Sequence, residues 1–206
     1  QLLSKVDDEK LRKVLDVFSK AATEVCEGQQ WDMDFETQNN VEISEYMKMI
    51  EYKTAVLLAA SLQIGGITGG ATIQEQENLY EFGRNIGIAF QLKDDLLDAF
   101  GNPDTFGKQV GGDILSNKRT YLYLQSLVAA QGAQKEALKH WFSSKQHDAI
   151  EKVKAVKALY KDLGIQTMTI DLMHEYHQKA MTHLQEIEGD KTGLEEFAAM
   201  LLQRES

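Results

Sequence analysis

Apolar residues recur at steps of three and four along most of the chain, the spacing that places them on one face of an α-helix. The clearest case is the segment 6–30, where the apolar residues fall into a single stripe. The members of this stripe are Leu11, Val14, Leu15, Phe18, Ala21, Ala22 and Val25. No run alternates Val, Ile and Thr with polar residues, as a half-buried strand would. We therefore predict an all-α fold.

The same pattern predicts further helices and the breaks between them. Their expected ranges are 44–64, 73–100, 114–130, 135–142, 146–160, 165–187 and 191–202. Ser44 and Asp113 are expected to cap the helices that follow them, because their side chains accept hydrogen bonds from the first backbone N–H groups. The polar stretch 31–40 and the stretch 101–112, which holds the only proline, are expected to be loops. Glycines in 65–70 should break the second helix.

Composition and charge limit the classes of function that are possible and leave the predicted fold unchanged. The chain has 206 residues, 43% of them hydrophobic, and no linker divides it, so residues 1–206 are predicted to form one domain. The net charge of −10 and the lack of a basic patch exclude a nucleic-acid partner. The most apolar run, 55–67, is too short and too interrupted to span a bilayer. A single cysteine, Cys26, excludes an internal disulfide, suits the cytoplasm and is expected to be a packing residue.

Three aspartates, Asp94, Asp95 and Asp98, lie on one predicted helix. Asp94 and Asp98 are one turn apart, so their carboxylates leave the same face. Converging carboxylates repel each other unless a cation compensates them, and Mg²⁺ prefers such oxygen ligands while keeping positions for water and phosphate. Taken alone, the motif fits a solvated acidic face equally well. The apolar Leu96 and Leu97 inside it favour a partly buried Mg²⁺–diphosphate site.

Lysines follow or flank this motif at Lys93, Lys108 and Lys118, and such cations suit phosphate groups. Lys53 opens the apolar run of the second helix, and two interpretations of it stay open. It is either a lysine that snorkels at the helix surface, which that segment alone favours, or a cation directed into a cavity. The glycines before Lys108 do not form a nucleotide-binding P-loop, because their spacing is one residue too long and no Ser or Thr follows.

Several short motifs together resemble the trans-isoprenyl diphosphate synthases, also called polyprenyl synthetases. In chain order they are Gly28-Gln29 with Asp32, Lys53-Thr54, Phe90-Gln91 followed by Asp94-Asp95-x-x-Asp98, Gly107-Lys108, Gly112-Asp113 and Lys118-x-Thr120. A lone Asp-Asp-x-x-Asp motif would be weak, but the order and spacing of the whole set are specific. The likeness runs over essentially the whole chain and is strongest in 90–120.

This resemblance implies the isoprenoid synthase helical bundle and a head-to-tail prenyl transfer. Mg²⁺ and lysines would hold an allylic diphosphate while it ionises, and isopentenyl diphosphate would attack the allylic cation. Asp94 would be a direct Mg²⁺ ligand, and Asp95 and Asp98 would act directly or through water. The implied substrate contacts are Lys53, Lys108 and Lys118 on the allylic diphosphate, Thr54 and Gln91 near the cation, and Phe90 at the isopentenyl site. Of these residues, the expected catalytic ones are Lys53, Thr54, Gln91 and Lys118.

The family has two aspartate-rich motifs, and this sequence carries only the second. Asp7-Asp8 is not the first motif, because neither a third aspartate nor an arginine pair follows at the right place. The chain therefore resembles the C-terminal portion of a synthase whose N-terminal helices are missing. We expect residues 1–206 to be inactive alone, and the resemblance implies a homodimer.

Two alternatives to a synthase remain. A class I terpene cyclase shares the fold, but its motif has Ser or Thr in place of Asp98 and Glu in place of Asn102. A non-catalytic subunit of a heteromeric synthase is also compatible with the fold. Nothing would oblige such a subunit to keep Asp94, Asp95 and Lys118, so the motifs favour the enzyme.

Overall fold

The computed structural model describes residues 6–38, 40–102, 110–143 and 148–203, and every regular element in these ranges is a helix. The elements are α1 (Asp8–Phe35), α2 (Ile43–Ile50), the π-helix η2 (Glu51–Ala55), α3 (Val56–Gly69), α4 (Ile73–Phe100), α6 (Gly112–Leu115), α7 (Tyr121–Ala129), α8 (Gly132–Ser143), α9 (Ala149–Asp162), α10 (Ile165–Gln185) and α11 (Thr192–Gln203). The predicted all-α class is confirmed. None of the helices in the described ranges is long and apolar enough to cross a bilayer.

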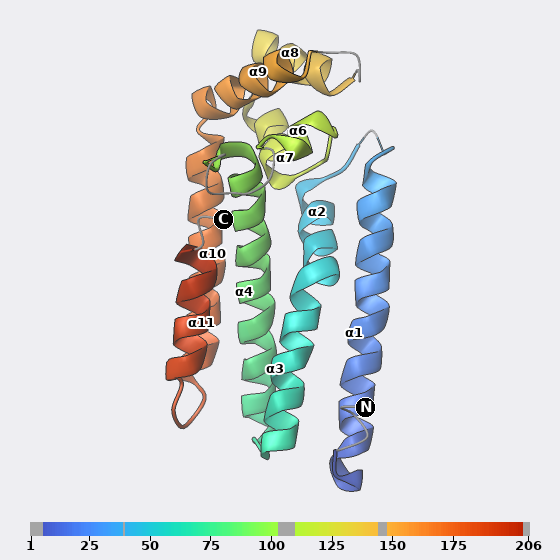
Figure 1. Ribbon diagram of the computed structural model, residues 1–206, viewed down its shortest axis with the longest axis vertical. Coiled ribbons are helices and arrows are strands. Elements are labelled where there is room, and N and C mark those ends of the chain that lie inside the picture. Colours follow the sequence, from blue (N-terminus) through green and yellow to red (C-terminus); the bar gives the residue numbers. More distant parts are fainter. Residues whose placement is uncertain (1–5, 39, 103–109, 144–147, 204–206) are drawn as a thin grey trace.

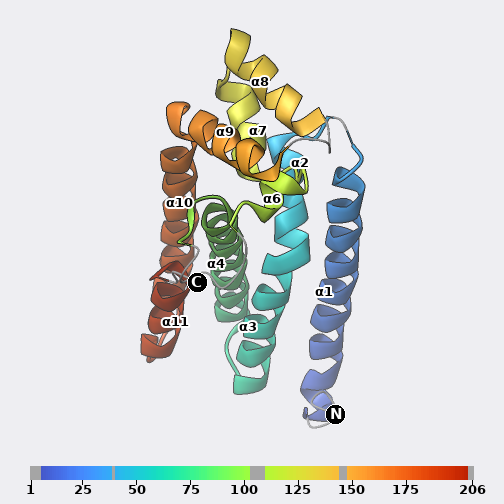
Figure 2. The same cartoon turned by 45° about the horizontal axis from the view of Figure 1, so that its top comes forward.

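The long helices α1, α3, α4 and α10 stand side by side, with α11 lying against α4 (Figure 1). Helix α4 is central, because it packs on α3 along one side and on α10 along the other. Its Phe82, Ile86 and Leu92 are almost completely buried. The short helices α6 to α9 cover one end of this layer (Figure 2). The C-terminal end of α4 therefore meets the start of the short helices, and the candidate site lies there.

Small residues let the helices around this site approach closely. The buried positions of α1 are Val14, Ala21, Gly28 and Phe35, seven residues apart in each case. A Cβ atom at Gly28 would lie 2.8 Å from the Cα atom of Lys53, a distance that real Cβ contacts do not reach. Gly28 is thus required for the contact between α1 and η2.

Gly87 does the same on the other side of η2, where a Cβ atom would lie 2.6 Å from the Cα atom of Ala55. The π-helix is therefore held between α1 and α4 by two glycines. It adds one residue to a helical turn between α2 and α3, and such insertions are frequent at functional sites. Lys53 and Thr54 both lie within this π-helix.

Several predicted helix ends are wrong. The stretch 31–40 is not all loop, because α1 continues to Phe35, which is buried. Ser44 does not cap α2; Glu42 is the N-cap residue and forms a reciprocal capping box with Glu45. The second predicted helix does not end at residue 64, because α3 continues through most of the glycine-rich stretch to Gly69. It is capped by Gly70, whose φ of 84° is the left-handed conformation that glycine favours.

The single helix predicted over 114–130 is two helices, α6 and α7. The chain leaves α6 through Asn117, which has a φ of 57°, and the side chain of Asn117 accepts a hydrogen bond from the buried Lys152. Asp113 is not the N-cap residue of α6; that position is Gly111. Lys118 therefore lies in an irregular segment rather than on a helix, which leaves its side chain able to reach back to α6.

Two other expectations concern single positions. Cys26 is exposed rather than packed in the core. Gly107, Lys108 and the first residues of the predicted helix 146–160 lie outside the described residues.

Candidate active site

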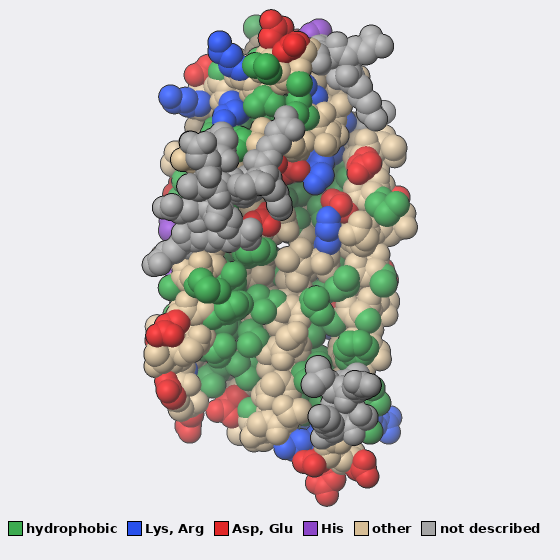
Figure 3. Space-filling model, viewed as in Figure 1, with side chains coloured by type: hydrophobic (Ala, Val, Ile, Leu, Met, Phe, Trp, Pro, Cys, Tyr) green, Lys and Arg blue, Asp and Glu red, His purple; other side chains and the backbone are tan. Residues whose placement is uncertain are grey.

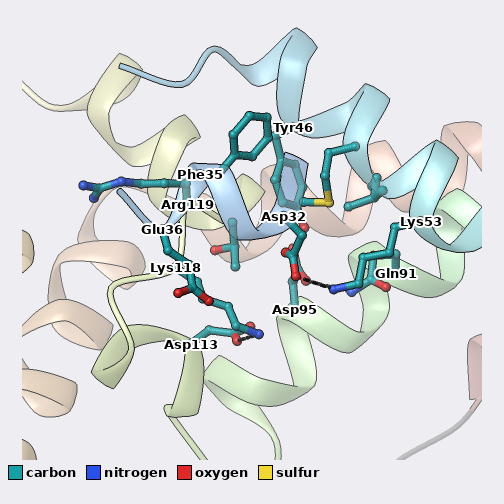
Figure 4. Close-up of a pocket in the computed structure, with 13 residues that line it drawn as sticks. Asp32, Phe35, Glu36, Tyr46, Lys53, Gln91, Asp95, Asp113, Lys118 and Arg119 are labelled. Atoms are coloured by element: carbon teal, nitrogen blue, oxygen red, sulfur yellow. Dashed lines mark hydrogen bonds and ion pairs between the residues drawn. The ribbon is translucent and has the colours of Figure 1, made fainter. Parts of the chain in front are cut away.

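A pocket of about 60 Å³ lies where α1, α2, η2 and α4 meet the segment that follows α6. Most of the residues that line it are polar or charged (Figure 4). The lining residues are Asp32, Phe35, Glu36, Tyr46, Met49, Ile50, Lys53, Gln91, Asp95, Asp113, Lys118, Arg119 and Thr120. Carboxylates and lysines from segments far apart in the sequence thus share one small space.

Lys53 projects from the π-helix into this pocket and meets Asp32 of α1, with 2.6 Å between Nζ and Oδ2. The pair is partly buried, since 33% of the Lys53 side chain and 23% of the Asp32 side chain are exposed. The continuation of α1 beyond Gly28 is what carries Asp32 to this place. Of the two interpretations of Lys53, this position supports a cation directed into a cavity.

Lys118 forms a second pair on the same pocket, with 2.9 Å between its Nζ and Oδ1 of Asp113. Partial burial alone would lower the pKa of Lys118, but the hydrogen bond and the charge of Asp113 outweigh burial, so the pKa is raised. The charges of Asp32 and Asp95 add to this effect. The two ion pairs are therefore close enough to act on each other.

Asp95 is buried at the back of the pocket and accepts hydrogen bonds on both oxygens. The hydroxyl of the buried Tyr46 donates to Oδ2, and Gln91 Nε2 donates to Oδ1 at 3.3 Å. Gln91 in turn accepts a hydrogen bond from Thr54 Oγ1 at 3.2 Å. Burial raises the pKa of Asp95 to about 7, although the Tyr46 hydrogen bond opposes the rise. One connected network therefore joins α2, α4 and η2.

Asp98 also accepts hydrogen bonds from the backbone at the start of α6. Its Oδ2 accepts the backbone N–H of Asp113 at 3.0 Å, and its backbone carbonyl accepts the N–H of Gly111 at 2.6 Å. Burial and the charge of Asp113 raise the pKa of Asp98. Asp98 thus fixes the start of α6 against the end of α4. Asp94 is partly buried and does not line the pocket.

Phe90 and Thr54 line an apolar groove of about 370 Å³ beside the charged pocket. The other residues on this groove are Leu57, Leu58, Ser61, Gly87, Phe197 and Leu201. In the space-filling view, charged side chains lie in the upper part and along the lower edge of the molecule, and hydrophobic side chains form a broad area between them (Figure 3). The Thr54–Gln91 hydrogen bond connects the groove to the pocket.

Comparison with protein families matches residues 1–163 to the model described as polyprenyl synthetase. The chain belongs to the polyprenyl synthetase family. It is 47% identical over 128 residues to a geranylgeranyl diphosphate synthase of Methanosarcina mazei, which is 61% of this chain and 40% of that protein. It is also 32% identical over 187 residues to the geranylgeranyl diphosphate synthase of Saccharolobus solfataricus, covering 91% of this chain and 56% of that protein.

Solved structures of this family share the fold. One geranylgeranyl pyrophosphate synthase superposes on 100% of this chain with a TM-score of 0.91 and 43% identity, which accounts for 64% of that chain. Another, from Corynebacterium glutamicum in complex with isoprenyl diphosphate and magnesium, gives a TM-score of 0.88 and 27% identity over 98% of this chain. The isoprenyl synthase bundle is thus confirmed, and the chain spans about 40% of the length of the Methanosarcina relative.

The donor set of this polyprenyl synthetase chain fits a shared metal rather than a closed metal cage. No group of three His, Cys, Asp or Glu residues is arranged to hold a metal ion in the ranges that the structure describes. Mg²⁺ usually takes only one or two carboxylates and completes its shell with water and phosphate oxygens. Four carboxylates, Asp32, Glu36, Asp95 and Asp113, line the pocket, and one or two of them are enough for such an ion.

Sequence reasoning missed two residues that line the pocket, Tyr46 and Arg119. Tyr46 was only one position in an amphipathic pattern, and the π-helix that holds Lys53 lies between α2 and α3. Arg119 directly follows Lys118, and its guanidinium lies 5.0 Å from the centre of the Tyr123 ring. Its Nε and Nη1 are buried and have no hydrogen-bond partner within the described ranges. No motif of the sequence singled out either residue.

Proposed function

We propose that this chain provides the diphosphate-binding wall of an enzyme that condenses an allylic diphosphate with isopentenyl diphosphate to a longer trans-polyprenyl diphosphate. The observation that carries the proposal is the pocket itself. Two lysines from separate elements, Lys53 and Lys118, point into one space that adjoins an apolar groove. A phosphate head and an apolar tail need such neighbouring surfaces.

In this proposal the lysines bind the allylic diphosphate and neutralise the charge that develops as it leaves. The allylic C–O bond breaks, and the bonding electrons stay with the diphosphate. The double bond of isopentenyl diphosphate forms the new C–C bond, and a proton is lost to the released diphosphate. Thr54 and Gln91, fixed by their mutual hydrogen bond, direct oxygen atoms toward the cation. The apolar residues around Phe90 keep water away from it.

We assign Mg²⁺ as the cofactor, because it would stabilise the leaving diphosphate when bound. Asp94 would be its direct ligand, while Asp95 and Asp98 would act mainly through the positions they fix, given their hydrogen bonds to Tyr46 and to the Asp113 backbone. The C. glutamicum relative was crystallised with magnesium, which supports the choice of ion. Lys108 keeps its proposed role on the allylic diphosphate, although it lies outside the described residues.

We further propose that the enzyme is a cytoplasmic homodimer. Leu15, Phe18 and Met33 are 40%, 46% and 56% exposed and lie on one side of α1. Such a row of large apolar side chains supports a contact with another helix. The single cysteine supports a reducing compartment. Sedimentation of the full-length protein tests the dimer, and a monomer at micromolar concentration would contradict it.

The decisive experiment incubates the full-length protein with an allylic diphosphate, isopentenyl diphosphate and Mg²⁺ and identifies the product by mass. We expect a product longer by whole five-carbon units and no product when a chelator removes the metal. A cyclised hydrocarbon would support a terpene cyclase, and no product would support a non-catalytic subunit. Residues 1–206 alone should show little turnover, because relatives of this chain are longer than it.

A further inference from the structure

Lys152 is a buried cation on α9 that the proposed reaction does not use. Only 3% of its surface is exposed, and it forms no ion pair with an acidic residue in the part of the chain that the structure describes. Its Nζ donates a hydrogen bond to Oδ1 of Asn117 and lies 5.3 Å from the centre of the Phe142 ring. Burial and the positive charge of Arg119 lower the pKa of Lys152. A buried ammonium group without a carboxylate costs stability, and an apolar side chain would fill the same space without that cost.

Asn117, which accepts this hydrogen bond, has an unusual backbone conformation. Its φ of 57° makes it the one non-glycine residue with a positive φ in the described ranges. Residues with a side chain disfavour this conformation, although asparagine tolerates it better than most. The hydrogen bond from Lys152 therefore stabilises a conformation that the chain would otherwise leave. Because Lys118 is the next residue, this conformation sets the direction in which the chain carries Lys118.

A second contact of α9 holds the other end of the same turn. A Cβ atom at Gly111 would lie 2.8 Å from each Cγ atom of Val153, the residue that follows Lys152. Gly111 has a φ of 89°, and its N–H donates to the backbone carbonyl of Asp98 at 2.6 Å. Helix α9 thus contacts both ends of the turn 111–117, which contains α6, and Figure 2 shows α9 beside it. The turn is therefore held between α4 and α9.

We propose that Lys152 is a positioning residue for Lys118. Its hydrogen bond to Asn117 keeps the chain in the left-handed conformation there and so keeps Lys118 at the diphosphate pocket. Lys152 itself does not line that pocket. Where a segment is not held, the conformation that binds is only one of several, and the apparent affinity falls with its population. This inference rests on the diphosphate site proposed above.

The first test measures the binding of inorganic pyrophosphate. It is titrated by calorimetry into the full-length protein at saturating Mg²⁺, for the wild type, Lys152→Met and Asn117→Gly. We expect both variants to bind pyrophosphate about tenfold more weakly, because each lacks the charged hydrogen bond that orders the turn. Glycine adopts a positive φ readily, so Asn117→Gly removes the acceptor without adding strain. Unchanged binding in both variants overturns the proposal.

A double-mutant cycle shows whether Lys152 acts through Lys118. Lys118→Ala alone should weaken pyrophosphate binding, because it removes the ammonium group. Adding Lys152→Met should then have no further effect, since no lysine remains at residue 118 to be positioned. If Lys152 supports the fold in general, the two losses add, which overturns the proposal whatever the change in stability. Should Lys152→Met fail to fold, Asn117→Gly takes its place in the same cycle.

The matched control is Lys154→Met on the same helix. Lys154 is exposed and does not line the diphosphate pocket, so this variant should bind pyrophosphate like the wild type. An equal loss in Lys154→Met would mean that the overall charge of α9 matters rather than the bond to Asn117, and this also overturns the proposal. A wild type that binds no pyrophosphate refutes the proposed function, and the positioning role falls with it. That result differs from intact binding that is insensitive to Lys152.

Discussion

The two sides of the pocket hold their lysines in different ways. On one side, Lys53 projects from a π-helix that is packed between α1 and α4 through Gly28 and Gly87. On the other side, Lys118 sits in an irregular segment after α6 and forms an ion pair with Asp113, whose backbone N–H donates to the carboxylate of Asp98. The first side depends on close backbone contact, and the second on polar side chains. Steric substitutions should therefore damage the first side, whereas charge and pH should act on the second.

The largest effect is expected for Gly28→Ala on the helical side. The added Cβ atom would meet the Lys53 backbone at 2.8 Å, and backbone cannot yield as a flexible side chain can. We expect the free energy of unfolding, measured by urea titration, to fall by about 3 kcal/mol. Gly65→Ala is the control, because a Cβ atom there meets nothing within 4 Å among the described residues. That variant should be more stable than the wild type by about 0.5 to 1 kcal/mol, and equal losses in both would disprove the packing role.

Asp94→Ala tests whether Asp94, on α4, is a metal ligand. In the full-length enzyme we expect turnover to fall at least about a hundredfold, roughly 2.7 kcal/mol in the barrier. The unfolding free energy should change little, because Asp94 is only partly buried. Steady-state assays at saturating Mg²⁺ measure the effect. Turnover close to that of the wild type would exclude Asp94 as a ligand.

Asp95→Asn tests how the charge of this buried α4 carboxyl affects stability as the pH changes. The buried carboxyl keeps its proton up to a pKa of about 7, whereas in the unfolded chain it loses the proton near 3.8. The folded state therefore binds one more proton between these values, and wild-type stability falls as pH rises through this window. Asparagine has no proton to lose. The free energy of unfolding of the variant should therefore rise by about 2 kcal/mol relative to that of the wild type as the pH goes from 5 to 8.

Urea titrations of both proteins in the presence of a chelator check this prediction, because a bound cation would itself favour the ionised carboxylate. If the two stability curves run parallel from pH 5 to pH 8, Asp95 is not the group that retains the proton.

The sequence predicted local features well, because helical periodicity depends on near neighbours. Apolar stripes located the long helices, and the spacing of Asp94 and Asp98 singled out the end of α4. The breaks were harder to predict. Asn117 leaves the helical conformation where Lys152, 35 residues away, bonds to its side chain, so the local pattern of 114–130 did not reveal the break.

Contacts made only in the folded chain account for the other errors. The first helix was expected to end near residue 30, but Gly28 packs against Lys53 within α1, and the longer helix brings Asp32 to Lys53. The π-helix is only five residues long, which is too short for a periodicity that is assessed over about 11 to 18 residues to detect it. The partnership between Tyr46 and Asp95 joins residues 49 positions apart, and no spacing rule connects them.

The smallest effect is expected for Tyr46→Phe, which breaks the hydrogen bond between α2 and Asp95 of α4. It removes only the hydroxyl that donates to Asp95, while the ring still fills its buried position in the core. A hydrogen bond to a charged carboxylate is stronger than one to a neutral carboxyl. The loss of stability should therefore be about 1 kcal/mol at pH 8, where Asp95 is ionised, and smaller at pH 5. Tyr80→Phe, on a partly buried tyrosine of α4 that does not line the pocket, should lack this pH dependence. A loss for Tyr46→Phe that is the same at both pH values would mean that the hydroxyl stabilises the core without acting through Asp95.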